Sequence, residues 1–209
     1  MATLSKYYVT SMDNDKKHLA LIKQGKFAEV LKDDEISEKV QLAAVKKAMI
    51  NLFLLLQSGK LKNSVLEHVI NKDILMLPAT MPNKNFNLSD EFLIKKLQAQ
   101  LPKHRIILAR KMIYASVKPL SEKVQLEMII NIHPDILLNL IEKRYKLSEA
   151  VQLAAVEQNP NLYFYLLSTR KKISDAVQTL AIKNKPSLYN VLVKQKIKIA
   201  QSTKDIIGV

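Results

Sequence analysis

A ten-residue segment recurs along this chain at a nearly constant interval. It reads LSEKVQLEMI from Leu120, LSEAVQLAAV from Leu147 and ISDAVQTLAI from Ile173, and an earlier copy reads ISEKVQLAAV from Ile36. The three later copies begin 27 and 26 residues apart. A fixed period of this length is typical of tandem structural repeats. The repeat therefore constrains the fold more than any other feature of the sequence.

Each copy predicts the start of a helix. An apolar residue is followed by Ser and then by an acid, as in Leu120-Ser121-Glu122. The serine oxygen can accept a hydrogen bond from an unpaired backbone N–H of the first turn, and the acid lies at the positive end of the helix dipole. In the copy from Leu147, steps of about 100° per residue leave only a narrow polar strip. This helix is expected to be covered by neighbours on several sides.

A second apolar helix is expected after each of these first helices. The dipeptides His133-Pro134, Asn159-Pro160 and Lys185-Pro186 separate the two. Proline is tolerated in the first turn of a helix because the N–H that it lacks would have been unpaired there. Apolar runs follow at 136–141, 162–167 and 188–193. Each copy therefore predicts a helical hairpin.

Earlier units are less regular but can be traced. They are expected to open at Ile36, Leu61 and Leu88, which keeps the period at 25–27 residues. The segment 77–87 contains two prolines and three asparagines and is predicted to be a loop. The step from Leu88 to Leu120 is longer than one period, so one helix there is expected to be extended.

The predicted fold is all-α, an α-solenoid of about six tandem helical hairpins. Only three glycines occur in 209 residues, which also favours helix over β-hairpins. We expect an N-terminal helical cap over 1–35, the repeat array over 36–199 and a C-terminal tail over 200–209. Each hairpin leaves an apolar face that only its neighbours can cover, so the hairpins are expected to stack.

The later copies resemble a known class of repeat. VQLAAVEQNP from Val151 and VQTLAIKNKP from Val177, each followed by spaced leucines, are similar to the short HEAT-like and leucine-rich-variant helical repeats. Similar arrays occur in effectors that intracellular bacteria inject into host cells, and the resemblance covers most of 36–199. It implies a scaffold that binds proteins or, less often, nucleic acid. It implies no catalytic residues.

Composition bears on the compartment. The chain has no cysteine, so it forms no disulfide and has no thiolate metal site, which suits a reducing cytosol. The N-terminal segment lacks the apolar core of a secretory signal. The longest apolar run, Leu52 to Leu56, is far shorter than the roughly 20 residues that span a bilayer. We expect a protein that does not insert into membranes and is cytoplasmic, or secreted into a host cytosol without a cleaved signal peptide.

Basic residues gather where one predicted repeat joins the next. The formal net charge is +14, from 33 Lys and Arg against 19 Asp and Glu. Stacking would merge the junction clusters into a positive ridge able to bind phosphates or an acidic protein. Alternatively, the cations only compensate helix C-termini, or reflect lysine enrichment of the whole chain. The predicted anion-binding residues are Lys143, Arg144, Lys146, Arg170, Lys171, Lys172, Lys194 and Lys196.

Glutamine recurs at one position of the repeat, and two tyrosines lie in the second helix of one unit. An amide donates and accepts, so a row of them can hold the backbone of a peptide, and tyrosine is frequent in binding hot spots. Alternatively, the amides bond neighbouring helices, and the tyrosines are core residues with a hydroxyl reaching water. The predicted partner-binding residues are Gln41, Gln125, Gln152, Gln178, Tyr163 and Tyr165.

No catalytic residues and no metal- or cofactor-binding residues are predicted. The four histidines lie far apart in the sequence, without a carboxylate at ligand spacing, and no glycine-rich phosphate loop or nucleophile elbow occurs. An enzyme would need a pocket built from scattered groups such as Glu127 or Glu157 with His133. We therefore expect a non-enzymatic scaffold that binds another protein. The alternative is a nucleic-acid-binding repeat protein that uses the lysine-rich ridge.

Overall fold

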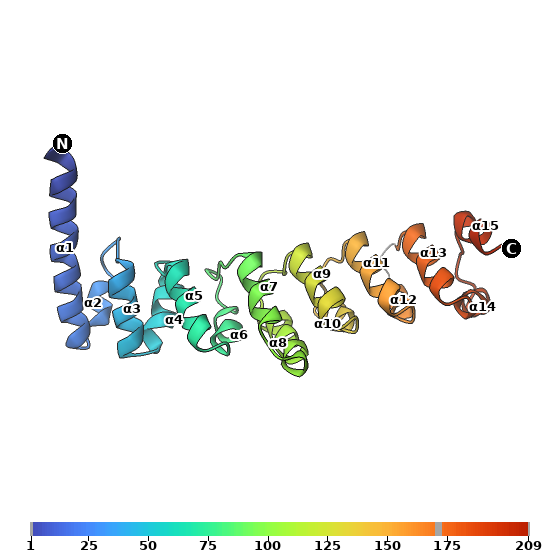
Figure 1. The fold of residues 1–209 in the computed structure, drawn as a ribbon, viewed down its shortest axis with the longest axis horizontal. Coiled ribbons are helices and arrows are strands. Elements are labelled where there is room, and N and C mark those ends of the chain that lie inside the picture. Colours follow the sequence, from blue (N-terminus) through green and yellow to red (C-terminus); the bar gives the residue numbers. More distant parts are fainter. Residues whose placement is uncertain (1, 170–172, 209) are drawn as a thin grey trace. The chain divides into compact units, whose positions relative to one another are not determined.

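The computed structural model describes residues 2–169 and 173–208, and every regular element among them is a helix (Figure 1). This confirms the predicted all-α class. None of the described helices is both long and apolar enough to cross a bilayer. The chain divides into two compact units, unit 1 from Met1 to Leu88 and unit 2 from Ser89 to Val209.

Unit 1 is a short stack in which α3 lies between α1 and α5. Val40, Leu52, Leu55 and Val65 have no solvent exposure, and burying a side chain of this kind contributes about 1.5–3 kcal/mol. Its helices are α1 (Ala2–Lys23), α2 (Phe27–Val30), α3 (Glu38–Lys47), α4 (Ile50–Ser58), α5 (Asn63–Lys72) and α6 (Met76–Thr80).

Unit 2 repeats the same arrangement with greater regularity. Its first helices α7, α9, α11, α13 and α15 contact one another in that order, and α8, α10 and α12 form a parallel series of contacts. Val124, Leu137, Ala155 and Ile182 are completely buried. The helices are α7 (Asp90–Gln98), α8 (Pro102–Ala115), α9 (Glu122–Asn131), α10 (Ile136–Glu142), α11 (Glu149–Gln158), α12 (Leu162–Ser168), α13 (Asp175–Asn184), α14 (Ser187–Lys194) and α15 (Gln201–Ile207).

The predicted serine caps are present. The side-chain oxygen of Ser121 accepts a hydrogen bond from Val124 N at 3.3 Å, and Ser148 and Ser174 make the equivalent bonds with Val151 and Val177. Ser37 and Ser89 cap α3 and α7 in the same way. Because a serine cap is worth about 1 kcal/mol, the repeated Ser fixes where each first helix begins.

A left-handed corner ends three of the second helices. Gly59 has φ 75°, and the corresponding corners are occupied by Arg144 with φ 60° and Lys196 with φ 56°. The residue after each corner donates its N–H back to a carbonyl of the last turn, as Tyr145 N does to Leu140 O at 2.9 Å. Left-handed backbone is unfavourable for residues with a Cβ. Arg144 and Lys196 therefore occupy a conformation that Gly59 adopts without strain.

Three segments depart from the regular repeat, at 77–87, 88–120 and 200–209. The extended helix expected between Leu88 and Leu120 is α8, with 14 residues. The loop expected over 77–87 begins inside α6, because Pro78 lies in the first turn, where its missing N–H breaks no helical bond. The segment expected as a tail, 200–209, contains α15, which packs on α13 through a 2.8 Å bond between the Thr179 and Thr203 hydroxyls.

Candidate binding surface

Gln41 is completely buried and holds the entry to the next first helix. Its Nε2 donates to Ile36 O at 3.0 Å and to Lys60 O at 2.9 Å. Its Oε1 accepts from Lys62 N at 2.9 Å, and Lys62 is the N-cap residue of α5. All these bonds are made within unit 1, so contact of this amide with a partner would require them to break.

Gln178 makes the same set of bonds at the last junction of unit 2. We call this set the glutamine clamp. Its Nε2 donates to Lys198 O at 3.0 Å, and its Oε1 accepts at 2.8 Å from the N–H of Ala200, the N-cap residue of α15. Nε2 also donates to the hydroxyl of Tyr163 at 3.0 Å. Tyr163 is only 1% exposed. Both residues line a cavity of about 810 Å³ between α12, α13 and the segment leading into α15.

Gln125 and Gln152 are less engaged. Their Nε2 atoms donate to Leu120 O at 2.7 Å and to Leu147 O at 3.3 Å, and their buried Oε1 atoms have no partner among the described residues. The helices that follow them begin at Ser148 and Ser174, which supply their own caps. Lys62 and Ala200 supply none. The full glutamine clamp thus occurs where the first helix of the next repeat lacks a serine cap.

Tyr165 differs from Tyr163 because half of its side chain is exposed. It belongs to a row of equivalent positions in successive second helices, Asn139, Tyr165 and Val191, which recur at intervals of 26 residues. Tyr114 of α8 joins the row, since Asn139 Nδ2 donates to its hydroxyl at 3.2 Å. We call Tyr114, Asn139, Tyr165 and Val191 the second-helix row. Three of these four side chains are large, partly apolar and exposed.

The predicted anion-binding residues that the structure describes lie close in the chain to acidic residues. Lys143, Arg144 and Lys146 are exposed, and so are Lys194 and Lys196. Lys143 Nζ donates to Tyr114 O at 3.1 Å. Exposed Glu142 and Glu149 flank the first cluster in the chain. The remaining predicted residues, Arg170, Lys171 and Lys172, lie outside the described residues.

Acidic groups also connect the beginnings of successive first helices in unit 2. Ser121 Oγ donates to Asp90 Oδ2 at 2.7 Å, and Lys123 Nζ donates to Glu91 Oε1 at 2.5 Å. Ser174 Oγ donates to Glu149 Oε1 in the same manner. The junction edge of unit 2 therefore carries charges of both signs.

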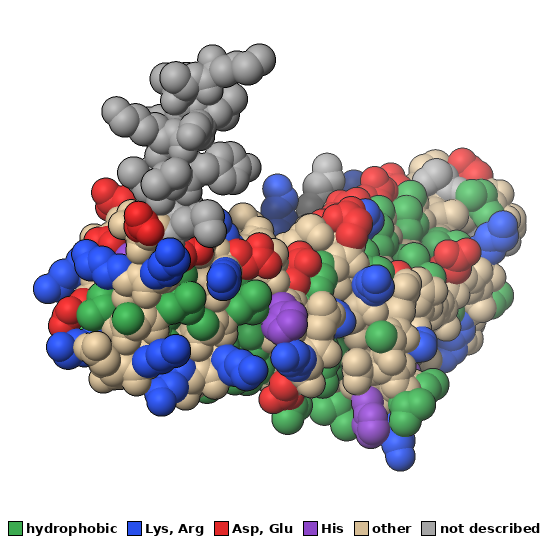
Figure 2. All heavy atoms as spheres, turned by 60° about the vertical axis from the view of Figure 1, so that its left-hand side comes forward, with side chains coloured by type: hydrophobic (Ala, Val, Ile, Leu, Met, Phe, Trp, Pro, Cys, Tyr) green, Lys and Arg blue, Asp and Glu red, His purple; other side chains and the backbone are tan. Residues whose placement is uncertain are grey.

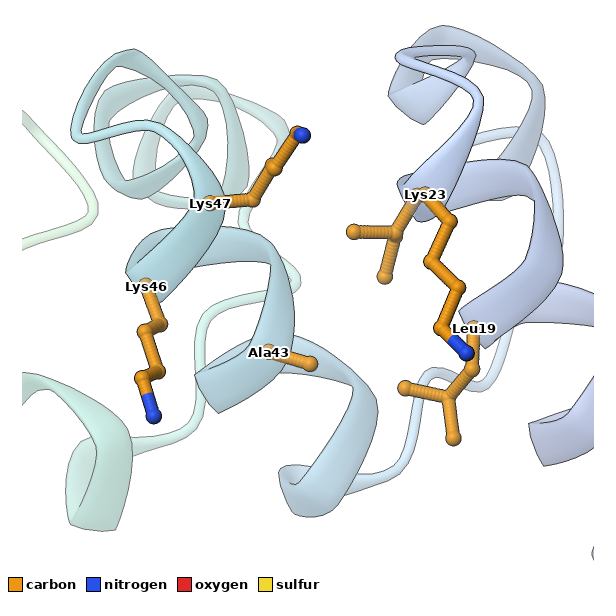
Figure 3. Close-up of a pocket in the computed structure, with 6 residues that line it drawn as sticks. Leu19, Lys23, Ala43, Lys46 and Lys47 are labelled. Carbon is orange, nitrogen blue, oxygen red and sulfur yellow. The ribbon is translucent and has the colours of Figure 1, made fainter.

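Two grooves in unit 1 were not predicted. The first lies between α1 and α3, has a volume of about 360 Å³, and is lined by Leu19, Ile22, Lys23, Ala43, Lys46 and Lys47 (Figure 3). The second lies between α3 and α5 and has a volume of about 480 Å³. Leu42, Val45, Met49 and Val69 line the second groove together with Ala43, Lys46, His68, Lys72 and Asp73. We call the two the lysine-bordered grooves.

A signal for these grooves is present in the sequence. The copy from Ile36 ends in Lys46-Lys47, where the copy from Leu147 has Glu157-Gln158. This difference between copies sets the end of α3 apart from the end of α11. The apolar contribution of Leu19 and Ile22 had no such signal, because α1 lies outside the repeat.

A buried histidine ties α1 to the two loops around α3. His18 is 2% exposed, and its Nε2 lies 2.5 Å from Asp33 Oδ2. Lys60 Nζ donates to Leu31 O at 2.8 Å and to Asp33 O at 2.7 Å. The His18 contact lowers the pKa of the Asp33 carboxyl, against the opposing effect of burial. The His18 contact thus ties α1 to the loop before α3, and Lys60 ties that loop to the loop before α5.

Comparison with known proteins identifies no relative. No family model matches the chain, no curated protein matches it, and no solved structure matches it. The surface geometry is therefore the basis on which a function is assigned.

Proposed function

We propose that this chain is a non-enzymatic helical-repeat scaffold with HEAT-like organisation, and that it binds another protein along the second-helix row of unit 2. The observation that carries the proposal is the exposure of Tyr165, at 50%, on a helix whose neighbouring Tyr163 is buried. Packing within unit 2 accounts for an aromatic side chain at Tyr163. It does not account for the one at Tyr165, which faces solvent.

The neighbours of Tyr165 in the row support the same role. Tyr114 is 43% exposed and Val191 37% exposed, and Val193 next to it is 49% exposed. Tyr114 is held in place because its hydroxyl donates to Glu142 and accepts from Asn139. The exposed side chains of α8, α12 and α14 are partly apolar, and the row is interrupted only by Asn139 of α10. Clusters of exposed apolar side chains are typical of protein interaction sites. Tyrosine adds contact area together with a hydrogen-bonding hydroxyl.

We further propose that the scaffold works as an adaptor or effector in a cytosol, either of the producing cell or of a host. The absence of cysteine supports this setting, because such a chain needs no oxidising compartment to fold. The resemblance to helical arrays of bacterial effectors points the same way.

Site-specific photo-crosslinking tests the binding role of the row. A photoreactive phenylalanine analogue at Tyr165 is expected to give discrete protein adducts in producing cells. The same analogue at Asn184, which is exposed at the end of α13, is the matched control. With a captured partner in hand, Tyr165→Ala should weaken binding about tenfold or more, as truncation of a hot-spot residue does. Equal adducts at both positions would refute the proposal.

Nucleic-acid binding is a second candidate, supported by Arg144 and Lys196. Strained backbone at exposed residues is a feature of functional sites, and these two basic residues occupy left-handed corners where Gly59 stands in unit 1. Their combined replacement, Arg144→Glu with Lys196→Glu, should abolish salt-sensitive binding of an oligonucleotide. Unchanged mobility of the oligonucleotide with the unmodified protein at low salt removes this candidate.

A further inference from the structure

We propose that the lysine-bordered grooves of unit 1 dock an acidic amphipathic helix from a protein partner. The inference rests on the proposed function in taking the ligand to be a protein. It adds a surface distinct from the second-helix row and specifies the chemistry of the partner.

The two grooves lie on either side of α3 and have apolar floors. Leu19 of α1 faces Ala43 of α3 in the first groove (Figure 3), and Ile22 also lines it. Val45 and Val69 line the second, and Met49, which is 45% exposed, lies at its end. Ala43 and Lys46 belong to both grooves. The two grooves are therefore adjacent, and one ligand that crosses α3 can occupy both.

The borders of the grooves are strongly cationic. Lys23, Lys46, Lys47 and Lys72 are all exposed, and none has an acidic or hydrogen-bonding partner among the described residues. The one acid in the lining, Asp73, accepts a hydrogen bond from Leu75 N. On the side that Figure 2 brings forward, hydrophobic side chains are bordered by Lys and Arg side chains. Charge complementarity thus calls for an anionic ligand.

Helix-dipole compensation alone does not account for these lysines. Lys23, Lys47 and Lys72 end α1, α3 and α5, and cations are favourable at helix C-termini. In unit 2, α7 and α13 also carry basic residues in the last turn, but α9 and α11 carry none. The fold therefore does not require a cation at this position, and unit 1 supplies four around an apolar floor.

The dimensions favour a helix over other anionic ligands. Three neighbouring helices spaced by about 8–10 Å span roughly 16–20 Å, which a helix of about 12 residues covers at 1.5 Å per residue. Apolar residues at i, i+3, i+4 and i+7 would enter the grooves, and flanking Asp or Glu would meet the lysines. A nucleic acid would leave the apolar floors unused.

The test uses the full-length chain and a fluorescein-labelled synthetic peptide, an amphipathic helix with Leu on one face and Glu on its flanks. Fluorescence anisotropy gives the dissociation constant. Lys46→Glu, which reverses the charge shared by both grooves, is expected to weaken binding about tenfold through like-charge repulsion. Lys46→Gln should give an intermediate loss. Lys183→Glu is the matched control, since Lys183 is the equivalent residue in α13. Circular dichroism checks that all variants remain folded.

Four further probes separate the alternatives. A peptide with Lys in place of Glu and a peptide of shuffled order should not bind, because they lack the charge or the apolar face. Anionic vesicles and a single-stranded oligonucleotide complete the set. The inference is overturned by absent peptide binding at millimolar concentration, by equal losses in the Lys46 and Lys183 variants, or by Lys46-dependent binding of vesicles or oligonucleotide instead. If crosslinks at Tyr165 persist in any of these cases, only the docking site fails and the proposed function stands.

Discussion

Gln178 Nε2 donates a hydrogen bond to the hydroxyl of Tyr163 across 3.0 Å, in the interior of unit 2. Both residues are predicted from the sequence to bind a partner. In the structure they bind each other, and the remaining bonds of the amide go to the loop that enters α15 and to Thr203 of α15 itself. The pair therefore links α12 and α13 to α15. Its removal is expected to weaken the attachment of α15 first.

Gln178→Ala should destabilise unit 2 by about 2–3 kcal/mol, because it leaves the Ala200 N–H and the Lys198 carbonyl without their bonds. Gln152→Ala should cost less than about 1 kcal/mol, since only one bond of 3.3 Å is lost. Urea unfolding followed by circular dichroism measures both. Hydrogen exchange should locate the loss of protection in α15 for the first variant. Equal effects of the two substitutions would contradict the clamp.

Tyr163 should make the fold sensitive to alkali. Burial raises the pKa of its phenol above the ordinary value of 10.0. The folded state therefore keeps this proton when the unfolded state has lost it. The associated stability is complete below about pH 10 and falls as the pH rises through the raised pKa. Tyr163→Phe should flatten this decline in the free energy of unfolding. An identical alkaline slope in both proteins would show that Tyr163 does not contribute.

At the left-handed corners, removing a glycine and introducing one should change the free energy of unfolding in opposite directions. Gly59→Ala should destabilise by about 1 kcal/mol, through the backbone rather than a clash, because the nearest atom to the added Cβ is Asn85 Nδ2 at 3.6 Å. Arg144→Gly should stabilise by about 0.5–1 kcal/mol. Lys143→Gly is the control, since Lys143 has an ordinary φ of −76°, and it should lose stability. Thermal unfolding decides the three signs.

Acid should weaken the attachment of α1. The pKa of Asp33 lies below its ordinary value of 3.8, chiefly because of its hydrogen bond with His18. A depressed folded-state pKa gives stability that is present above pH 3.8 and is lost as the pH falls through the lower value. Asp33→Asn should remove this acid-dependent part. Asp34→Asn is the matched control, because among the described residues the hydrogen bond of His18 is made with Asp33 and not with Asp34. Proteolysis near α1 at graded pH is the measurement, and identical profiles for the two variants would exclude the His18 contact as the cause.

Most of the fold can be predicted because successive helical hairpins have similar sequences. Ser121, Ser148 and Ser174 mark helix starts that the structure confirms. The starts of α5 and α15 carry Lys62 and Ala200 instead, and the glutamines that hold them lie about one repeat earlier. A side chain that both donates and accepts gives no indication from sequence whether its partner is the chain itself or another molecule.

The candidate sites were less predictable, for a similar reason. Tyr163 and Tyr165 are two residues apart, and only the packing of α12 decides that one is buried and the other exposed. The lysine-bordered grooves depend on α1, whose Leu19 and Ile22 belong to no repeat. Patterns within a repeat predict contacts between its copies. They do not predict which side chains a helix outside the repeat, such as α1, contributes to a groove.

The glutamine clamps join residues only about twenty positions apart, and even the bonds from Lys123 to Glu91 and from Tyr145 to Ile113 span only 32. Chains dominated by such near-neighbour contacts fold quickly. Synthesis proceeds from the N-terminus, so each hairpin can find its predecessor already in place as it leaves the ribosome. Nascent hairpins of this protein need not wait for distant segments before they become protected from aggregation and proteases.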